Sequence, residues 1–339
     1  MLRFLTLFSV FSTASLIAHG PGRVNDFQGR RVLFIGIDGC RADAISEAME
    51  RGLAPQVKTL VESEHGLFTR TCYAGGELDS PTHQPTVSGP GWSSLLTGVW
   101  IDRHHVKDNR FFGARFQTYS HFMRRIKEVK PAAWCASFAD WPPIHDNIAD
   151  GSRVNGAEFL DMKFTTKPDA SRHYIDNPEK DIDVRDEALK TLRTQNPDAM
   201  FVYFGSVDEF GHGAIDERSS FTPENALYLN AISHVDSHVG ELARALRARK
   251  KFAEEDWLVL ITTDHGGRGN AHGGDSDMER SIWLIAHGTH LPRERLLHSP
   301  VPQTALVPMI YDHLGISPKP EWTPEPPKPP PPPTAEQKK

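Results

Sequence analysis

The sequence has little cysteine, no excess of positive charge and no long apolar run beyond its first residues. Three cysteines among 339 residues are too few for a disulfide framework. Cys40, Cys72 and Cys135 lack CxxC spacing, so we expect no thiolate zinc site. Export would permit one disulfide, but the sequence does not decide which pair would form it.

The formal net charge is −6, whereas proteins that bind nucleic acid usually carry a basic balance or a basic stripe. We therefore expect no nucleic-acid partner. Aspartate, histidine, glycine and proline are frequent after the predicted strands and in the loops, which is typical of a small-molecule site.

The amino terminus has the pattern of a secretion signal. A short basic region, Met1–Arg3, precedes the apolar run Phe4–Ala18, and Ala18-His19-Gly20 offers small residues to a signal peptidase. The run is short for a membrane span of about 20 residues. We interpret residues 1–18 as a signal peptide, with an uncleaved anchor as the alternative. The protein is then periplasmic, secreted or membrane-anchored, and no later segment is predicted to cross a bilayer.

Short apolar runs alternate with helical patterns along the chain. We interpret the runs as buried parallel strands: Arg31–Ile37, Ala132–Phe138, Met200–Gly205, Trp257–Thr262 and Ser281–Ala286. Helical patterns include Pro55–Glu64, Phe116–Lys127, Asp183–Arg193 and Pro223–Lys250. This alternation predicts an α/β fold with a mostly parallel central sheet and helices on both faces.

Two segments depart from this alternation. Residues 140–178 have little periodicity and are rich in Asp, Asn, Gly and Pro, which is typical of an elaboration near a site. Residues 317–339 are rich in Pro, Lys and Glu, and such a composition predicts an extended, disordered tail. We expect one catalytic domain over residues 30–316, with the elaboration inside it and the tail after it.

Acidic residues and histidines follow three of the predicted strands, and one more histidine lies in a glycine-rich loop. The set is Asp38, Asp208, His212, Asp264, His265 and His272. A single aspartate after a strand can be a helix cap, but three strands would deliver these side chains to one sheet edge. Carboxylate and imidazole are ligands that zinc accepts in catalytic sites. We therefore predict two Zn²⁺ ions per chain.

A nucleophile is available in the segment 85–98, where Ser88 precedes an apparent helix that ends at Gly98. The free backbone N–H groups and the dipole at a helix N-terminus favour a bound anion. A serine there could coordinate zinc, ionise at neutral pH and attack phosphorus in line. Alternatively, Ser88 only caps the helix, and the segment alone does not decide between these roles.

The order and spacing of these motifs are more specific than any one of them. The matching elements are Pro85-Thr86-Val87-Ser88-Gly89-Pro90, Thr97-Gly98, Asn109 at 21 residues after Ser88, Asp208 with His212, Asp264-His265-Gly266 and His272-Gly273-Gly274. Over about residues 30–316 the chain resembles the type I phosphodiesterase and nucleotide pyrophosphatase branch of the alkaline phosphatase superfamily.

The resemblance implies two metal sites and a covalent mechanism. Asp38, Ser88, Asp264 and His265 would hold the zinc that activates the nucleophile, and Asp208, His212 and His272 the zinc that faces the leaving group. Asn109 and the backbone N–H near Gly89 would donate hydrogen bonds to a phosphate oxygen. The implied activity is hydrolysis of a small-molecule phosphate ester through a phosphoseryl intermediate.

Three positions depart from the family pattern. Ser88 replaces the threonine of the nucleotide pyrophosphatases, Gly91 stands where many have Asn, and His105 stands where Gly usually follows His104. The last two changes argue against assuming a nucleotide substrate, and the sequence leaves monoester and diester preference open.

The alternatives are a sulfatase-like or phosphomonoesterase hydrolase of the same superfamily, and a non-catalytic metal-binding relative. Sulfatases carry arginine where this chain has Trp92, and their calcium prefers oxygen ligands to histidine. A non-catalytic relative is less consistent with a competent residue at every expected catalytic position.

Overall fold

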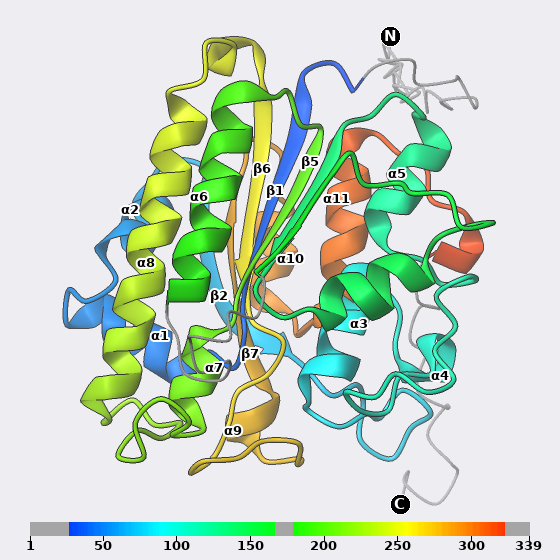
Figure 1. The fold of residues 1–339 in the computed structure, drawn as a ribbon. Helices are drawn as coiled ribbons and strands as arrows, with labels where there is room; N and C mark the ends of the chain where they lie inside the picture. The colour runs from blue at the N-terminus through cyan, green and yellow to red at the C-terminus, as the bar shows by residue number, and fades with distance from the viewer. Residues whose placement is uncertain (1–26, 167–178, 323–339) are drawn as a thin grey trace, which may run out of the picture.

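A central sheet runs through the molecule, and helices cover both of its faces (Figure 1). The computed structural model describes residues 27–166 and 179–322. Within them the sheet has eight strands in the order β4-β3-β5-β1-β6-β7-β2-β8. The strands are β1 (Arg30–Ile37), β2 (Gly66–Tyr73), β3 (Cys135–Ala139), β4 (Met162–Thr165), β5 (Ala199–Phe204), β6 (Asp256–Thr262), β7 (Ser281–His287) and β8 (Val301–Pro302).

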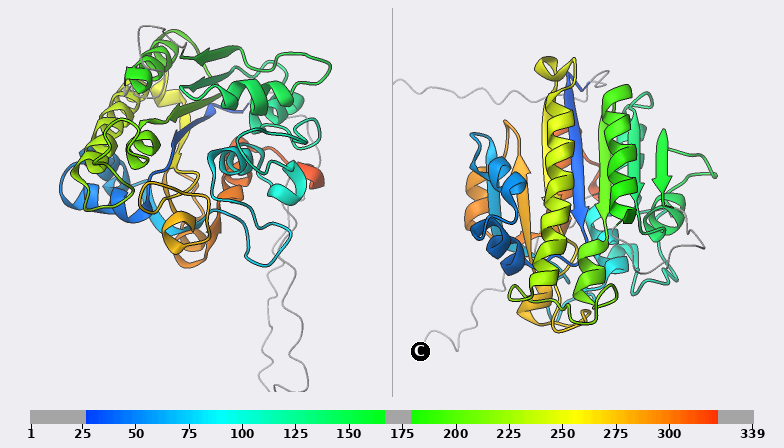
Figure 2. Two further views of the ribbon diagram at one scale, coloured as in Figure 1. Left: turned by 60° about the horizontal axis from the view of Figure 1, so that its bottom comes forward. Right: turned by 60° about the vertical axis from the view of Figure 1, so that its left-hand side comes forward.

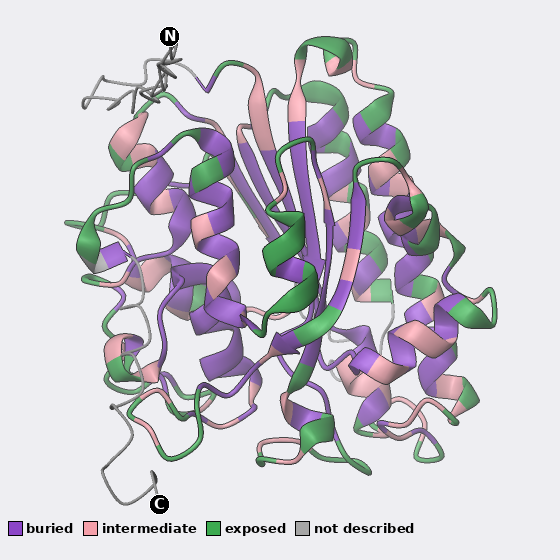
Figure 3. Cartoon of the chain, turned by 180° about the vertical axis from the view of Figure 1, so that it is seen from behind, coloured by how far each residue is buried: buried purple, intermediate pink, exposed green. Residues whose placement is uncertain are grey.

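The central strands are nearly continuous apolar runs because both faces of the sheet are covered. Side chains of β1 alternate between the two faces: Val32 and Phe34 belong to one core, and Leu33 and Ile35 to the other. All four are at most 1% exposed. Figure 3 shows the same contrast, with a buried sheet interior and exposed outer helix surfaces.

Each core is completed by its own layer of helices (Figure 2). One layer contains α1 (Ala42–Glu50), α2 (Pro55–Glu62), α6 (Glu179–Thr194) and α8 (Ala226–Arg247), and the other contains α3 (Ser88–Thr97), α5 (Phe122–Val129), α10 (Arg293–His298) and α11 (Leu306–Leu314). Shorter helices are α4 (Ile101–His104), α7 (Ser206–Gly211), α9 (Asp277–Arg280), a π-helix at Ile144–Ala149 and 3₁₀ turns at Phe252–Glu254, Gln303–Ala305 and Pro320–Trp322. The predicted fold class, a mostly parallel sheet between two helix layers, is confirmed.

The expectation that Ser281–Ala286 is a parallel strand is wrong. Strand β7 pairs antiparallel with β6 and with β2. The reason lies in the connection between β6 and β7, which contains only the one-turn helix α9 and no helix long enough to cross the sheet. The chain therefore leaves β6 at its carboxyl end and enters β7 at the same end of the sheet, so β7 runs in the opposite direction to β6.

The predicted helix over Phe116–Lys127 starts too early. Helix α5 begins at Phe122, because the side chain of His121 accepts a hydrogen bond from the Met123 N–H and caps the helix there. Helices α1, α10 and α11 and strands β2, β4 and β8 were not predicted. The described part of the expected elaboration contains the π-helix and β4, which pairs with β3 at the edge of the sheet.

Cys40, Cys72 and Cys135 are all buried and free. No helix within residues 27–166 and 179–322 is both long and apolar enough to cross a membrane. The predicted signal peptide and most of the predicted tail, from residue 323 onward, lie outside the described residues.

Candidate active site

Three neighbouring strands bring the predicted ligands to one edge of the sheet. Asp38 follows β1, Asp208 lies in α7 directly after β5, and Asp264 follows β6. Because β5, β1 and β6 are parallel neighbours, their carboxyl ends meet. Helix α3 begins beside them with Ser88, and the loop before α9 carries His272.

The first group of side chains is the inner cluster, Asp38, Asp264 and His265, which is buried. His265 Nε2 lies 3.2 Å from Asp264 Oδ2 and 3.5 Å from Asp38 Oδ1. Ser88 Oγ lies 3.5 Å from Asp38 Oδ1 and 3.4 Å from His265 Nε2. Each residue of the cluster offers one ligand atom within 4.8 Å of the others. The serine hydroxyl therefore faces a set of two carboxylates and one imidazole.

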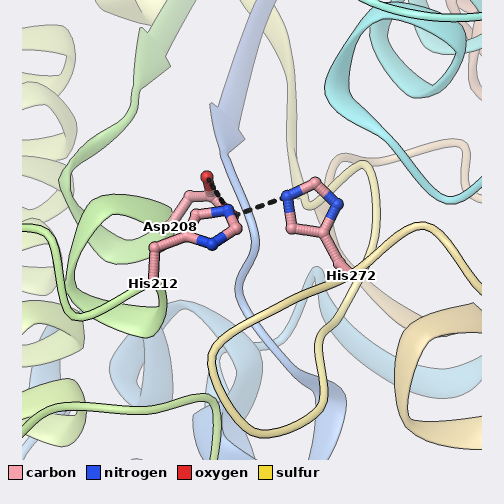
Figure 4. Close-up of side chains that lie close together, drawn as sticks. All are labelled: Asp208, His212 and His272. Atoms are coloured by element: carbon pink, nitrogen blue, oxygen red, sulfur yellow. Dashed lines mark ion pairs between the residues drawn. The ribbon is translucent and has the colours of Figure 1, made fainter.

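The second group is the outer cluster, Asp208, His212 and His272, which is open to solvent at His212. Figure 4 shows the two imidazoles approaching the Asp208 carboxylate from separate segments of the chain. His212 Nε2 lies 3.4 Å from Asp208 Oδ2, and His272 Nε2 lies 3.6 Å from Asp208 Oδ1. The rings of His265 and His272 stack with centroids 3.9 Å apart, so the two clusters are adjacent.

All three histidines are oriented by backbone carbonyl groups. His265 Nδ1 lies 2.8 Å from the backbone oxygen of Gly266. His272 Nδ1 lies 2.8 Å from the backbone oxygen of Thr86, and His212 Nδ1 lies 2.9 Å from that of Asn270. A carbonyl can only accept, so each Nδ1 carries a proton and donates. Nε2 is therefore the nitrogen of each ring that faces the carboxylates, which is the orientation of a metal-ligating histidine.

The electrostatics of the two clusters fit bound cations. Burial, reinforced by the charge of Asp208, raises the pKa of Asp38 to about 7. Burial and the charge of Asp38 raise the pKa of Asp264 well above its usual range. Among the described residues, the buried oxygens Asp264 Oδ2 and Asp208 Oδ1 have no hydrogen-bond partner. A cation in each cluster would supply the missing partner and favour the ionised carboxylates.

Ser88 does not act as the cap of α3. It is the first residue of the helix, Val87 occupies the N-cap position, and no side chain caps the helix. Its hydroxyl instead lies within hydrogen-bond reach of the inner cluster. Gly91 permits this approach, because a Cβ atom there would lie 2.9 Å from Cβ of Asp264.

Asn109 meets the same helix N-terminus. Its Oδ1 accepts a hydrogen bond from the Gly89 N–H at 2.7 Å. The family resemblance implies that this N–H donates directly to phosphate. In the structure it donates to Asn109 instead and orients the amide of that side chain. The amide nitrogen of Asn109 is left as the donor. Asn109 is exposed and lines the same pocket as Ser88, whereas Gly89 is buried.

Several residues of the site were missed by sequence reasoning. Tyr203 and Trp92 both donate to Oδ2 of Asp38, at 2.5 and 2.8 Å. A pocket of about 220 Å³ beside Ser88 and Asn109 is lined further by Asp140, Trp141, Lys180 and Glu209. Trp92 lies in the segment that contains Ser88, but its contact and those of the other residues follow from the fold, and no spacing in the sequence marks them.

The fold and the sequence together place the chain in the alkaline phosphatase superfamily. Similar solved structures include a 2-O GAG sulfatase (14% identity, 87% of this chain and 72% of that chain, TM-score 0.62). A phosphonate monoester hydrolase from Silicibacter pomeroyi is 16% identical, with a TM-score of 0.60; the match covers 85% of this chain and 74% of that chain. The C-terminal periplasmic domain of EptC from Escherichia coli, in complex with Zn, is 11% identical, with a TM-score of 0.60; the match covers 86% of this chain and 83% of that chain.

The family follows from the sequence itself. A model of the type I phosphodiesterase / nucleotide pyrophosphatase family matches residues 32–278. The chain belongs to this family. No curated protein matches the sequence.

Proposed function

We propose that this protein is a zinc-dependent phosphodiesterase that uses Ser88 as its nucleophile. The observation that carries the proposal is the position of Ser88 Oγ, 3.5 Å from Asp38 Oδ1 and 3.4 Å from His265 Nε2, in front of a buried three-ligand cluster. Asp38, Asp264, His265 and Ser88 would hold one Zn²⁺, and Asp208, His212 and His272 the other. The mixed carboxylate and imidazole ligands are those of catalytic zinc sites.

Bound zinc would supply Lewis acidity that ionises the Ser88 hydroxyl and stabilises charge on the leaving oxygen. In the first step, Ser88 Oγ forms a bond to phosphorus while the bond from phosphorus to one ester oxygen breaks. Asn109 donates its amide N–H to a non-bridging oxygen as charge develops there. In the second step, water forms the new bond to phosphorus, and the Oγ–phosphorus bond breaks to restore Ser88.

Gly89 contributes by orienting Asn109 through the 2.7 Å hydrogen bond from its backbone N–H. The glycine itself is required by close packing, because a Cβ atom at this position would lie 2.7 Å from the backbone oxygen of Asp108. Backbone N–H groups at the start of α3 also give the segment a positive end toward an anionic substrate.

The proposed substrate is a small-molecule phosphate ester handled outside the cytoplasm. Export is supported by the signal-like pattern of residues 1–18. Among the similar structures, two are periplasmic domains of EptC proteins. The negative net charge supports the absence of a nucleic-acid partner.

The test compares metal content with substrate choice. Purified protein should contain close to two zinc ions per chain, and chelation should abolish turnover. Activity should be highest on bis-p-nitrophenyl phosphate or a nucleotide p-nitrophenyl ester, and lower on p-nitrophenyl phosphate and p-nitrophenyl sulfate. Preference for the sulfate with calcium bound would favour the sulfatase alternative, and preference for the monoester a phosphomonoesterase. Two bound zinc ions without turnover of any ester would favour a non-catalytic relative.

A further inference from the structure

A third group of ionisable side chains lies at the pocket and behind its wall, outside both metal clusters. Asp140 directly follows β3, Asp181 lies in the first turn of α6, and Glu209 lies in α7. We call these three residues the acidic wall. Asp140 and Glu209 line the pocket together with Ser88 and Lys180, so the acidic wall lies where part of a substrate would lie.

The carboxyl groups of the acidic wall are unequally satisfied. Asp181 accepts hydrogen bonds from the Gly205 N–H at 3.1 Å and from the Ser206 hydroxyl. Glu209 Oε1 pairs with Lys180 Nζ at 3.2 Å, but its buried Oε2 has no hydrogen-bond partner among the described residues. Asp140 is 6% exposed, and its buried Oδ1 likewise has no partner there.

Asp140 also lies against Asp181, and burial together with the Asp181 charge raises the pKa of Asp140 well above its usual range. Among the described residues, Glu209 pairs with Lys180 and neither Asp140 nor Asp181 makes an ion pair, so within this part of the chain the carboxyl groups of the acidic wall outnumber the cations paired with them. Buried carboxylates that lack donors are costly. A bound cation with N–H groups would supply both the charge and the donors.

The pocket lining also includes an aromatic side chain, that of Trp141, the chain neighbour of Asp140. The Trp141 ring lines the pocket and stacks on Tyr203, with centroids 6.3 Å apart and an interplanar angle of 24°. An aromatic face next to carboxyl groups suits an organic cation, whose carbon atoms and charge can both contact the ring. A bare metal ion would gain little from an indole.

We propose that the acidic wall and Trp141 bind a primary ammonium group carried by one ester group of the substrate. This proposal rests on the proposed phosphodiesterase function. It assigns the substrate to a chemical class, phosphodiesters of an amino alcohol, in which the phosphate lies at Ser88 and the ammonium group lies at Asp140 and Glu209.

The test uses the zinc-loaded enzyme and two chromogenic diesters of matched size. These are p-nitrophenyl 2-aminoethyl phosphate and the uncharged p-nitrophenyl propyl phosphate. The ratio of their kcat/KM values measures recognition of the ammonium group. Because hydrogen bonds to charged groups contribute about 1.5–3 kcal/mol, the wild-type enzyme should favour the amino ester by roughly 10- to 100-fold.

Two variants should move this ratio in opposite directions. Asp140→Asn keeps the shape of the side chain and can donate to Asp181, but it cannot carry charge, so the ratio should fall toward one. Lys180→Gln removes the cation that competes at Glu209, so the ratio should rise. Asp146→Asn, at an exposed site outside the pocket, should leave both kcat/KM values unchanged.

Each result bears on the proposal. Equal efficiency on the two esters would overturn it while leaving the proposed function intact. An unchanged ratio in folded Asp140→Asn would also overturn it. If Asp140→Asn does not fold, an unchanged ratio in Lys180→Gln decides against the proposal. A third equivalent of metal retained without ammonium preference would assign the acidic wall to a metal instead. Failure to turn over either ester would contradict the proposed function, and this inference would fall with it.

Discussion

The hydroxyl of Tyr203 donates a hydrogen bond of 2.5 Å to Oδ2 of Asp38. The indole N–H of Trp92 donates to the same oxygen at 2.8 Å. With Oδ2 held by two donors, Oδ1 is the oxygen that faces Ser88 and His265. Gly36 makes room for the indole, because a Cβ atom there would lie 2.3 Å from the Trp92 ring. The two aromatic side chains thus fix which oxygen of Asp38 is available to a metal.

Tyr203→Phe should weaken metal binding at the inner cluster. The loss of one donor frees the Asp38 carboxylate to rotate, and loss of a hydrogen bond that orients a ligand typically lowers metal affinity by about 10- to 100-fold. Competition with a chelator, followed by measurement of zinc content, should show one weakened site and one unchanged site. Tyr311→Phe, at a buried tyrosine of α11 in the core, is the matched control. Equal loss of zinc from both sites would contradict a local effect on Asp38.

Asn109→Ala should slow turnover while the protein stays folded and zinc-loaded. In the proposed mechanism the Asn109 amide donates to the phosphoryl oxygen, and removal of such a donor typically costs about 100- to 1,000-fold in kcat. Single-turnover kinetics and zinc analysis on the same sample would separate slow chemistry from metal loss. Exposed Asn155 offers a control asparagine, as Asn155→Ala. Near-normal turnover of Asn109→Ala would show that the spacing from Ser88 is accidental.

Acid should destabilise the protein through its buried histidines. Burial, with the nearby charge of Arg185, lowers the pKa of His238 from 6.5 to about 4. The unfolded chain therefore binds a proton that the folded chain does not as pH falls from about 6.5 to about 4, and stability is lost across that window.

The contribution of His238 can be isolated by mutation. His238→Gln should show a smaller decrease in Tm between pH 7 and pH 5 than the wild-type chain, with chelator present throughout to remove metal effects. His298→Gln changes an exposed histidine and should leave that decrease unaltered. An identical decrease in the His238→Gln chain would contradict a neutral buried imidazole.

That the proposed ligands would lie close together was predictable from sequence because of one rule of parallel sheets. Asp38, Asp208 and Asp264 each follow a strand, and strand ends meet at one edge. The alternation of strands and helices also predicted the layers. By contrast, the direction of β7 depends on whether the preceding connection crosses the sheet. The apolar residues of Ser281–Ala286 suit a parallel or an antiparallel strand equally well, so the segment itself did not predict the direction.

Contacts between elements were not predictable in the same way. Tyr203 and Asp38 come from different strands, and their hydrogen bond depends on the register that pairs Gly36 with Tyr203. The acidic wall draws one residue each from the end of β3, from α6 and from α7. None of these spacings along the chain is a motif, because proximity arises only after the sheet has assembled.

Ser88→Ala is the variant on which the mechanism depends. If Ser88 attacks phosphorus, its loss should lower kcat by several orders of magnitude, while the two clusters keep their carboxylate and imidazole ligands and most of their zinc. Three neighbouring hydroxyls have other contacts: Thr86 donates to the Gly274 oxygen at 2.7 Å, Ser93 to the Gly89 oxygen at 2.6 Å, and Ser94 to Gln84 Oε1 at 3.1 Å. Alanine at any of the three should be far milder, and Ser93→Ala is the best matched control because it lies in the same helix.

Stereochemistry gives an independent measure of the same step. Attack by Ser88 followed by attack of water comprises two in-line displacements, so a chiral phosphorothioate diester should be hydrolysed with net retention at phosphorus. Brief reaction and acid quenching should also trap phosphate on the peptide that contains Ser88. Inversion would mean that water attacks the diester directly. Ser88, whose Oγ lies 3.4 Å from His265 Nε2, would then act as a metal ligand only and would form no covalent bond to the substrate.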